Sequence, residues 1–435
     1  MNVLIIGSGG REHAMAWKVR QSVLCDKLFC LPGNPGTANW SCNIVGDPRN
    51  FSQIKRAVID NKIDLVVVGP EDPLVNGLKD YFTGDESLKK VLFIGPCKRG
   101  AQLEGSKDFA KHFMSKYGIP TASYKSFTPE TIEEGESYLE TMQSPYVLKA
   151  DGLAAGKGVL ILNELNEAKE KLKEIFGGKF GEAGKTVVIE QFLKGIELSV
   201  FVLTDGKNYM VLPEAKDYKR IYDGDKGLNT GGMGAVSPVP FAGRSFMKKV
   251  EERIIRPTLD GLVKEGIEYR GFIFIGLMNC SGEPYVIEYN VRMGDPETES
   301  VMTRIDSDLL SHFKAAAEGT LGKESIKISP YGALTVVCVS GGYPESYKKG
   351  MEISGALPPD YRAGRDEPKI FHSGTVINGD KLLTSGGRVL AVTVNGESIE
   401  SCRKKVYSLL ERVNYDGMFF RRDIGLDVLS YGEGQ

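Results

Sequence analysis

The sequence predicts an α/β and α+β multidomain protein: an open parallel α/β domain first, a ligand-binding core second and a small α+β domain last. Three observations predict this order. The length of 435 residues suggests about three domains. In the first hundred residues, apolar runs alternate with helical stretches, which is typical of a parallel sheet covered on both faces. From about residue 328, short strand-like runs and one amphipathic helix replace that alternation. We expect domains at 1–102, 103–327 and 328–435.

Composition and charge exclude several classes of protein. The chain is 41% hydrophobic and 26% charged, with a formal net charge of −2, so no overall field attracts nucleic acid or an anionic membrane. Any phosphate site must therefore be a local cluster of cations. No basic leader precedes the first strand, and no apolar run approaches the ~20 residues of a membrane span. We expect a cytoplasmic protein whose partners are small molecules.

The seven cysteines and four histidines are scattered along the chain. No C-x-x-C pair occurs, so neither a disulfide framework nor a zinc site is indicated. Structural roles are expected for these eleven residues.

The first domain has strand patterns at residues 3–6, 63–68 and 91–94, and a helix pattern at 11–23. Ligands of parallel sheets bind beyond the carboxyl ends of the strands. Those ends carry polar or glycine-rich turns at 7–11, 33–37 and 69–72, which include Gly69, Pro70 and Glu71.

The first of these turns resembles a dinucleotide-binding loop but is incomplete. Glu12 occupies the third glycine position of G-x-G-x-x-G, and no acidic residue at the ribose spacing clearly ends a second strand. A single phosphate on the amides of Gly9 and Gly10, at a helix N-terminus, fits better than NAD.

The middle of the chain predicts a lobe and a core. Helices at 104–117, 129–142 and 165–175 and a strand at 186–193 place a small strand–helix lobe at about 121–192. A charged, glycine-rich segment at 213–240 follows, and a loop of that length is usually functional or disordered. A helix at 244–266 then precedes two strands, 272–277 and 285–292, which are expected to form an antiparallel pair.

A lysine-rich segment at 146–159 is the first chemical signal. A strand pattern delivers Lys149, and a loop with glycines at 152, 156 and 158 delivers Lys157. Small residues let backbone amides approach a polyphosphate closely. The segment is not a Walker A loop, because three residues rather than four separate Gly152 from Gly156 and because Gly158 stands where Ser or Thr would ligate magnesium. By itself the segment fits an ordinary hairpin with solvated lysines equally well.

The strand at 286–292 is the second signal. A period of two puts Glu288, Asn290 and Arg292 on one face. A carboxylate beside an amide carbonyl suits magnesium held between protein and phosphates, and an arginine can clamp a transferred phosphoryl group. The alternative is a half-exposed strand with a solvated polar face. The acidic run at 295–299 that follows favours the metal site.

The last domain has strand patterns at 333–339, 369–376 and 388–394. An amphipathic helix at 399–413 follows Ser398, a suitable N-cap.

Taken in order, these motifs resemble the ATP-grasp ligases. Within that superfamily the chain resembles the glycinamide ribonucleotide synthetase family over nearly its whole length. The motifs that carry this are Gly7-Ser8-Gly9-Gly10-Arg11-Glu12-His13, Gly69-Pro70-Glu71, the loop 150–158, Asn229-Thr230-Gly231-Gly232-Met233-Gly234-Ala235 and Asn290-Val291-Arg292-Met293-Gly294-Asp295-Pro296-Glu297.

The resemblance implies an ATP-grasp core with a mobile small lobe, and an enzyme that ligates glycine to 5-phosphoribosylamine in purine biosynthesis. It implies ATP as co-substrate, Mg²⁺ or Mn²⁺ as the metal, a glycyl phosphate intermediate and a monomeric protein. The catalytic residues implied are Lys149 and Arg292, and the metal ligands are Glu288 and Asn290. The ATP-binding residues implied are Lys107, Lys149, Gly156, Lys157, Gly158, Glu190, Gln191, Phe192, Leu193 and Glu197. The substrate-binding residues implied are Gly9, Gly10, Arg11, Gly69, Pro70, Glu71, Asp217, Lys219, Arg220, Asn229, Gly231, Gly232, Arg292 and Asp295.

The sequence departs from the family pattern at two places. Gln and His are expected where Lys216 and Tyr218 stand, and no carboxylate occurs in 271–280, where many ATP-grasp enzymes have a second acidic metal ligand. Another ATP-grasp carboxylate–amine ligase is the alternative function. A non-catalytic nucleotide-binding or redox protein is the third, and the incomplete NAD and Walker motifs argue against it.

Overall fold

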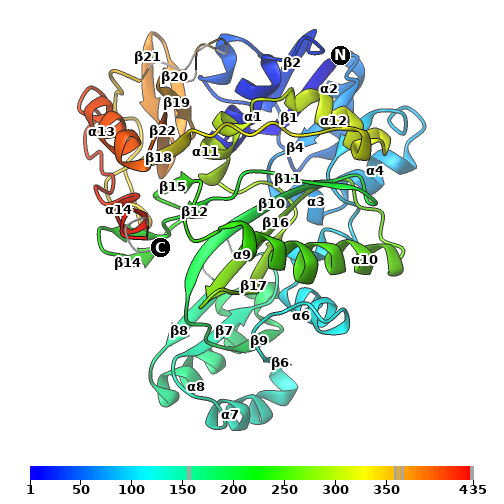
Figure 1. Cartoon of the computed structure of the whole chain (residues 1–435), viewed down its shortest axis with the longest axis vertical. Coiled ribbons are helices and arrows are strands. Elements are labelled where there is room, and N and C mark those ends of the chain that lie inside the picture. Colours follow the sequence, from blue (N-terminus) through cyan, green and yellow to red (C-terminus); the bar gives the residue numbers. More distant parts are fainter. Residues whose placement is uncertain (154–157, 357–359, 361, 363, 365–366, 432–435) are drawn as a thin grey trace.

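The computed structural model describes residues 1–153, 158–356, 360, 362, 364 and 367–431. Figure 1 shows an N-terminal part in blue, a C-terminal part in orange and red beside it, and a small lobe in cyan to green that projects at the opposite end. A four-stranded sheet in the middle lies between these parts.

The N-terminal part is a parallel sheet, as the sequence predicts. Its strands lie in the order β3-β2-β1-β4-β5, and each neighbouring pair is parallel. The predicted strand at 63–68 begins later, at Leu65. The elements are β1 (Asn2–Gly7), α1 (Gly10–Arg20), β2 (Lys27–Pro32), β3 (Cys42–Asn43), α2 (Phe51–Asp60), β4 (Leu65–Val68), α3 (Glu71–Val75), α4 (Leu78–Gly84) and β5 (Leu92–Ile94).

The small lobe is an antiparallel sheet with helices against it. Its strands lie in the order β6-β9-β7-β8. The helix predicted from residue 129 begins at 132, because residues 129–131 form a single 3₁₀ turn under a Thr128 cap. The elements are β6 (Tyr124–Phe127), α7 (Ile132–Glu140), β7 (Tyr146–Ala150), β8 (Val159–Leu162), α8 (Leu165–Glu174) and β9 (Val187–Gln191).

The central sheet carries the second signal found in the sequence. Its order is β11-β10-β16-β17, and the predicted pairing of the last two strands is confirmed as antiparallel. The elements before and around it are α5 (Gln102–Gly105), α6 (Lys107–Lys116), β10 (Ile196–Thr204), β11 (Tyr209–Val211), α9 (Arg244–Val250), α10 (Arg256–Lys264), β16 (Gly271–Cys280), β17 (Glu283–Asn290), α11 (Glu297–Arg304) and α12 (Leu309–Glu318).

The C-terminal sheet takes two strands from the middle of the chain. Its order is β12-β15-β18-β22-β19, so residues 216–217 and 234–237 are built into the C-terminal sheet, and β13 and β14 between them form a separate two-stranded sheet. The elements are β12 (Lys216–Asp217), β13 (Arg220–Tyr222), β14 (Lys226–Asn229), β15 (Gly234–Ser237), β18 (Gly332–Val339), β19 (Lys369–His372), β20 (Thr375–Asn378), β21 (Lys381–Thr384), β22 (Arg388–Gly396), α13 (Ile399–Leu410) and α14 (Leu426–Leu429). The expected Ser398 cap on α13 is confirmed. The division at 102 and 327 stays a prediction.

The apolar cores explain which parts are joined. Two hydrophobic clusters each run through the N-terminal, central and C-terminal sheets. A third cluster, from Phe127 to Ile189, belongs to the lobe alone. The lobe is therefore the part whose core is separate from the rest. None of the helices in the described ranges is long and apolar enough to cross a membrane.

Candidate active site

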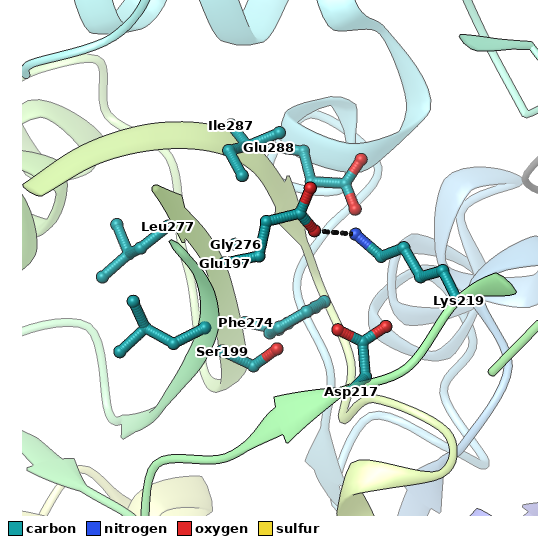
Figure 2. Close-up of a pocket in the computed structure, with 10 residues that line it drawn as sticks. Glu197, Ser199, Asp217, Lys219, Phe274, Gly276, Leu277, Ile287 and Glu288 are labelled. Carbon is teal, nitrogen blue, oxygen red and sulfur yellow. Dashed lines mark hydrogen bonds and ion pairs between the residues drawn. The ribbon is translucent and has the colours of Figure 1, made fainter. Parts of the chain in front are cut away.

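A charged pocket lies on one face of the central sheet. Glu197 and Ser199 come from β10, Glu288 from β17, and Asp217 and Lys219 from β12 and the residues after it. Figure 2 shows the Lys219 ammonium pointing toward the carboxylates of Glu197 and Glu288. Its Nζ lies 2.6 Å from Glu197 Oε2. The pocket thus places one cation among several acids.

Electrostatics keep this cation charged. Burial alone would lower the pKa of Lys219, but the carboxylates of Glu197, Asp217 and Glu288 outweigh burial and raise it well above its usual value. Lys219 in turn lowers the pKa of Glu197. Burial raises the pKa of Asp217, so this carboxyl is held less firmly as an anion. The pocket is suited to binding further positive charge, such as a metal ion or an amine.

A pair of lysines converges on Glu190 beside this pocket. Lys149 Nζ and Lys111 Nζ lie 3.1 and 3.0 Å from the same oxygen, Glu190 Oε2. Lys149 also donates to the carbonyl of Ile287 at 3.1 Å, next to Glu288. Glu190 Oε1 is buried without a hydrogen-bond partner among the described residues. An unpaired buried carboxylate oxygen is costly, so this atom marks a place for a ligand donor.

Lys111 is a site residue that the sequence reasoning missed. It stands one helical turn after Lys107 on α6, and spacing by four residues puts both on one face. Burial lowers the pKa of Lys111 to about 8, against the opposing effect of Glu190. That helix spacing was the available signal.

Lys107 holds the start of the predicted phosphate loop. Its Nζ donates to the carbonyl of Gly152 at 2.9 Å. Asp151 accepts from the Ser106 hydroxyl and the Asp108 amide, both at 3.1 Å, so it fastens the loop to the first turn of α6. The other end is fixed where the Ala150 amide donates to the Gly158 carbonyl. Gly156 and Lys157 lie outside the described residues.

The connector predicted to hold adenine follows directly. Glu190 and Gln191 end β9, and the Gln191 amide donates to the Ser123 carbonyl at 2.9 Å. Phe192 and Leu193 lead on toward β10.

The predicted metal ligands lie at the end of β17. Glu288 lines the pocket, and Asn290 is 8% exposed. Tyr289 points the other way and bonds Thr258 on α10, as the period of two requires. A bulge at the Gly276–Leu277 pairing lies just before Glu288. The described residues hold no group of three or more His, Cys, Asp or Glu arranged around a metal. One carboxylate and one amide oxygen therefore fit a hard cation that is otherwise held by phosphate and water.

Arg292 lies beyond the strand, which ends at Asn290. Its guanidinium nitrogens lie 2.8 Å from Glu104 Oε1 and 3.3 Å from Glu71 Oε2. Glu104, which sequence reasoning also missed, further accepts the Val291 amide. Burial raises the pKa of Glu104 to about 7, although Arg292 opposes this. Arg292 thus joins the first domain to the core.

Arg11 shares this junction. Its guanidinium pairs with Glu12 at 2.5 Å and donates to the Met293 carbonyl, which Arg292 also contacts. Gly69 packs against Glu12, because a Cβ at position 69 would meet the Glu12 carboxylate. Pro70 caps α3, whose first residue is Glu71.

The amides of Gly9 and Gly10 already have protein partners. Gly9 donates to Glu12 at 2.6 Å, and Gly10 donates to Ser373 Oγ at 2.8 Å. The Glu12 contact is a capping-box arrangement, which a glutamate at the third helical position predicts. Phosphate binding at these two amides stays a prediction, and it would have to displace or share these acceptors.

Two of the remaining predicted substrate residues, Gly231 and Asp295, contact Arg388. This guanidinium pairs with Asp295 at 3.0 Å and donates to the Gly231 carbonyl. The Gly231 amide donates a hydrogen bond to the Tyr343 hydroxyl at 2.9 Å. Gly232, at φ +116°, passes against Pro296. Asn229 pairs with Arg220 in the β13–β14 hairpin.

Comparison with known proteins identifies the family of this chain. Three models of phosphoribosylglycinamide synthetase match in succession: its N domain at 1–104, its ATP-grasp domain at 105–298 and its C domain at 333–427. A phosphoribosylamine–glycine ligase of Pseudomonas syringae pv. tomato is 45% identical over 100% of this chain and 99% of that protein. The chain belongs to the phosphoribosylglycinamide synthetase family. The phosphoribosylamine–glycine ligase of Vibrio cholerae is 44% identical, and the alignment covers 99% of this chain and 99% of that protein.

Solved structures extend the comparison to the fold. The phosphoribosylamine–glycine ligase of Thermotoga maritima superposes with a TM-score of 0.83 at 39% identity, covering 98% of this chain and 100% of that one. A Campylobacter jejuni biotin carboxylase has a TM-score of 0.73 at 16% identity, covering 100% and 95%. The second likeness shows a shared fold. The predicted multidomain α/β fold class is confirmed. The family predicted from the sequence motifs is confirmed as well.

Proposed function

We propose that this chain joins glycine to 5-phosphoribosylamine at the expense of ATP, giving glycinamide ribonucleotide, ADP and phosphate in purine biosynthesis. Family membership supports the reaction, since the full-length relatives bear that ligase's name. The observation that carries it is the contact of Lys149 with the carbonyl of Ile287. This contact puts a lobe cation beside Glu288, where phosphates and a metal would have to meet.

The chemistry requires an activated carboxylate. Glycine's carboxylate is a poor electrophile, so its oxygen attacks the γ-phosphoryl group of ATP and forms glycyl phosphate and ADP. The amine of phosphoribosylamine then attacks the acyl carbon and releases phosphate. Phosphoryl transfer depends on positioning and cations more than on a protein nucleophile. Lys107, Lys149 and Lys157 are proposed to bind the ATP phosphates.

We assign the remaining roles to residues of the connector and of the pocket. The unpaired Glu190 Oε1 accepts a donor from adenine, with backbone groups of Gln191, Phe192 and Leu193 nearby. Glu197 takes the ribose hydroxyls. Glu288 and Asn290 hold Mg²⁺ or Mn²⁺, which neutralises phosphate charge when bound.

Binding of the acyl phosphate is assigned to Arg292. In the structure this side chain pairs with Glu71 and Glu104, so it would have to exchange one of these partners for the acyl phosphate. Asp217, Lys219 and Asp295 contact the two substrates. The protein is proposed to work as a cytoplasmic monomer.

An isotope experiment tests the route. Glycine labelled with heavy oxygen in its carboxylate should transfer one label to the released phosphate, and ADP should be the nucleotide product. Without phosphoribosylamine, net phosphate release should nearly stop, because the closed site shields the acyl phosphate from water. Unlabelled phosphate, or AMP with pyrophosphate, would contradict the acyl-phosphate mechanism. Phosphate release with a different acid or amine, but none with glycine, would favour another ATP-grasp ligase.

A further inference from the structure

The segment 216–219 presents its two faces to different parts of the molecule. Asp217 and Lys219 line the charged pocket. Lys216 and Tyr218 alternate with them and contact the C-terminal segment, residues 421–427, instead. Side chains alternate along an extended chain, so one face cannot shift without the other. The contacts that hold Lys216 and Tyr218 therefore also fix the positions of Asp217 and Lys219.

Asp427 on α14 holds both of these side chains. Its Oδ2 lies 3.0 Å from Lys216 Nζ, and its Oδ1 accepts the Tyr218 hydroxyl at 2.5 Å. That hydroxyl also accepts the Gly425 amide at 3.0 Å, so the buried tyrosine has both a donor and an acceptor satisfied. The Lys216 ammonium stands 3.7 Å from the centre of the Tyr218 ring. The two positions that depart from the family motif are thus both bound to one carboxylate.

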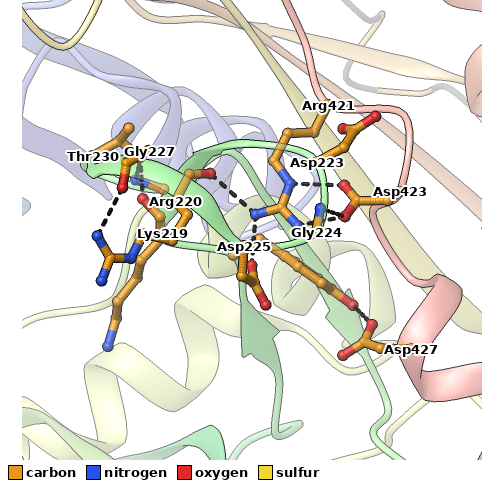
Figure 3. Close-up of polar contacts among 12 residues, drawn as sticks. Lys219, Arg220, Asp223, Gly224, Asp225, Gly227, Thr230, Arg421, Asp423 and Asp427 are labelled. Atoms are coloured by element: carbon orange, nitrogen blue, oxygen red, sulfur yellow. Dashed lines mark hydrogen bonds and ion pairs between the residues drawn. The ribbon is translucent and has the colours of Figure 1, made fainter.

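A second anchor fixes the hairpin that follows. The Arg421 guanidinium, only 1% exposed, binds Asp423 with two nitrogens at 2.7 Å. It also donates to the Arg220 carbonyl at 3.0 Å and to Asp225 at 2.8 Å. Figure 3 shows Arg421 between Asp225 of the hairpin and Asp423 of the C-terminal segment. Bidentate pairs of this kind fix direction as well as distance.

We propose that Asp427 is a positioning residue: through Lys216 and Tyr218 it sets Asp217 and Lys219 in the active-site pocket, and Arg421 fixes the adjoining hairpin. The inference rests on the proposed function, because that function gives Asp217 and Lys219 contact with the substrates. Asp427 itself does not line the charged pocket. The C-terminal segment in this way supports the pocket from about 200 residues away in sequence.

Asp427→Ala tests the proposal, with Glu400→Ala as the matched control. Asp427 is 42% exposed and Glu400 is a surface residue of the same C-terminal part, paired only with Lys404 among the described residues. Asp427→Ala should lower kcat/KM for glycine and for phosphoribosylamine at least tenfold. Its Kd for ADP should change much less than these values, since Glu190 on β9 is held by Lys111 and Lys149 and not by the segment 216–219. Asp427→Asn keeps an acceptor for the Tyr218 hydroxyl, so its kcat/KM should lie between that of the wild type and that of Asp427→Ala. Glu400→Ala should match the wild type.

A double variant tests the path of the effect. If Asp427 acts through Tyr218, Asp427→Ala/Tyr218→Phe should be no worse than Asp427→Ala alone, whereas independent effects would multiply. Circular dichroism gives the folded fraction of each variant. Unchanged kcat/KM in Asp427→Ala, or a loss no larger than its loss of folded protein, would overturn the proposal. A double variant whose loss equals the product of the two single losses would also overturn the proposal. Wild-type protein that makes no glycinamide ribonucleotide would instead overturn the proposed function.

Discussion

At the scale of single residues, the site is defined by how buried charges are paired. Glu190 shares one oxygen between Lys111 and Lys149 and keeps the other unpaired. Lys219 is surrounded by acids and Arg292 is paired with two. Removing one partner of a buried pair leaves an uncompensated charge, which costs more than the pair contributes. Substitutions here should therefore keep shape and change one charge.

Glu288→Gln is the sharpest residue-scale test of the metal site. The glutamine is isosteric, and no hydrogen bond or ion pair ties the Glu288 side chain to another described residue, so the fold should be kept. Loss of an anionic ligand should lower turnover by about 100-fold or more and raise the metal concentration needed for half-maximal rate. A titration of activity against Mg²⁺ and Mn²⁺ measures this.

Glu283→Gln is the control for that change. Glu283 lies at the other end of β17 and pairs with Lys249 and Arg253 on the surface. It should leave the metal dependence as in the wild type. An unchanged metal dependence in Glu288→Gln would remove Glu288 from the metal site.

At the scale of elements, the lobe is distinguished by its separate core. Leu139, Leu148 and Leu172 are fully buried in a cluster that contains only lobe residues. The polar link between Lys149 and Ile287 joins this lobe to the central sheet. A body with its own core and polar contacts to its neighbour can change position without unfolding, which is what a closing lobe requires.

Leu172→Ala on α8 should loosen the lobe alone. Deleting this buried side chain should cost about 2–5 kcal/mol of local stability. Because the lobe core is separate, hydrogen exchange should speed up in β6, β7, β8 and β9 and not in the N-terminal sheet. The KM for ATP should rise.

Ile161→Ala provides the matched control, since Ile161 is 51% exposed on β8 of the same lobe. It should leave exchange rates unchanged. If Leu172→Ala accelerated exchange equally in the N-terminal sheet, the lobe would not be an independent unit.

At the scale of the whole molecule, the N-terminal and C-terminal parts meet at two buried histidines. The His372 amide donates to His13 Nδ1 at 2.8 Å, which requires that nitrogen to be unprotonated. The Nε2 atoms of both rings are buried without a partner among the described residues. Burial, with the neighbouring His372, lowers the pKa of His13 well below its usual value, and burial lowers the pKa of His372 to about 4.

This junction predicts loss of stability in acid. Between about pH 6.5 and 4 the unfolded chain binds protons at these histidines and the folded one does not. Stability is therefore present above the unfolded pKa and is lost as pH falls through this window, by about 3 kcal/mol for His372. His372→Gln should flatten the fall in melting temperature between pH 6.5 and 4.

The exposed His112 on α6 supplies the comparison. His112→Gln should keep the wild-type pH profile. The pKa of Glu104 and of Glu297 is raised to about 7, so these two groups stabilise the folded protein as the pH falls. Subtracting the variant's profile of melting temperature against pH from that of the wild type removes their effect. A His372→Gln profile parallel to the wild type would contradict the assignment.

Much of the molecule follows from local sequence. Apolar runs and turn residues place β1, β16, β17 and most helices to within a few residues, because periodic burial is encoded locally. The order of motifs was enough to predict the family, and Lys107, Lys149, Glu197 and Glu288 do come together. These residues belong to strands and helix starts whose positions the pattern determines.

Only the tertiary structure decided how distant segments share partners. Lys111 and Glu104 gained roles because helices from one segment pack against strands from another. Arg292 was predicted on the face of a strand that in fact ends two residues earlier, and it faces Glu71 and Glu104 instead. Strands β12 and β15 joined the C-terminal sheet, and Asp427 came to hold Lys216 and Tyr218. Periodicity reports which side of an element is buried, whereas the partner of a buried charge depends on contacts between segments far apart in the chain.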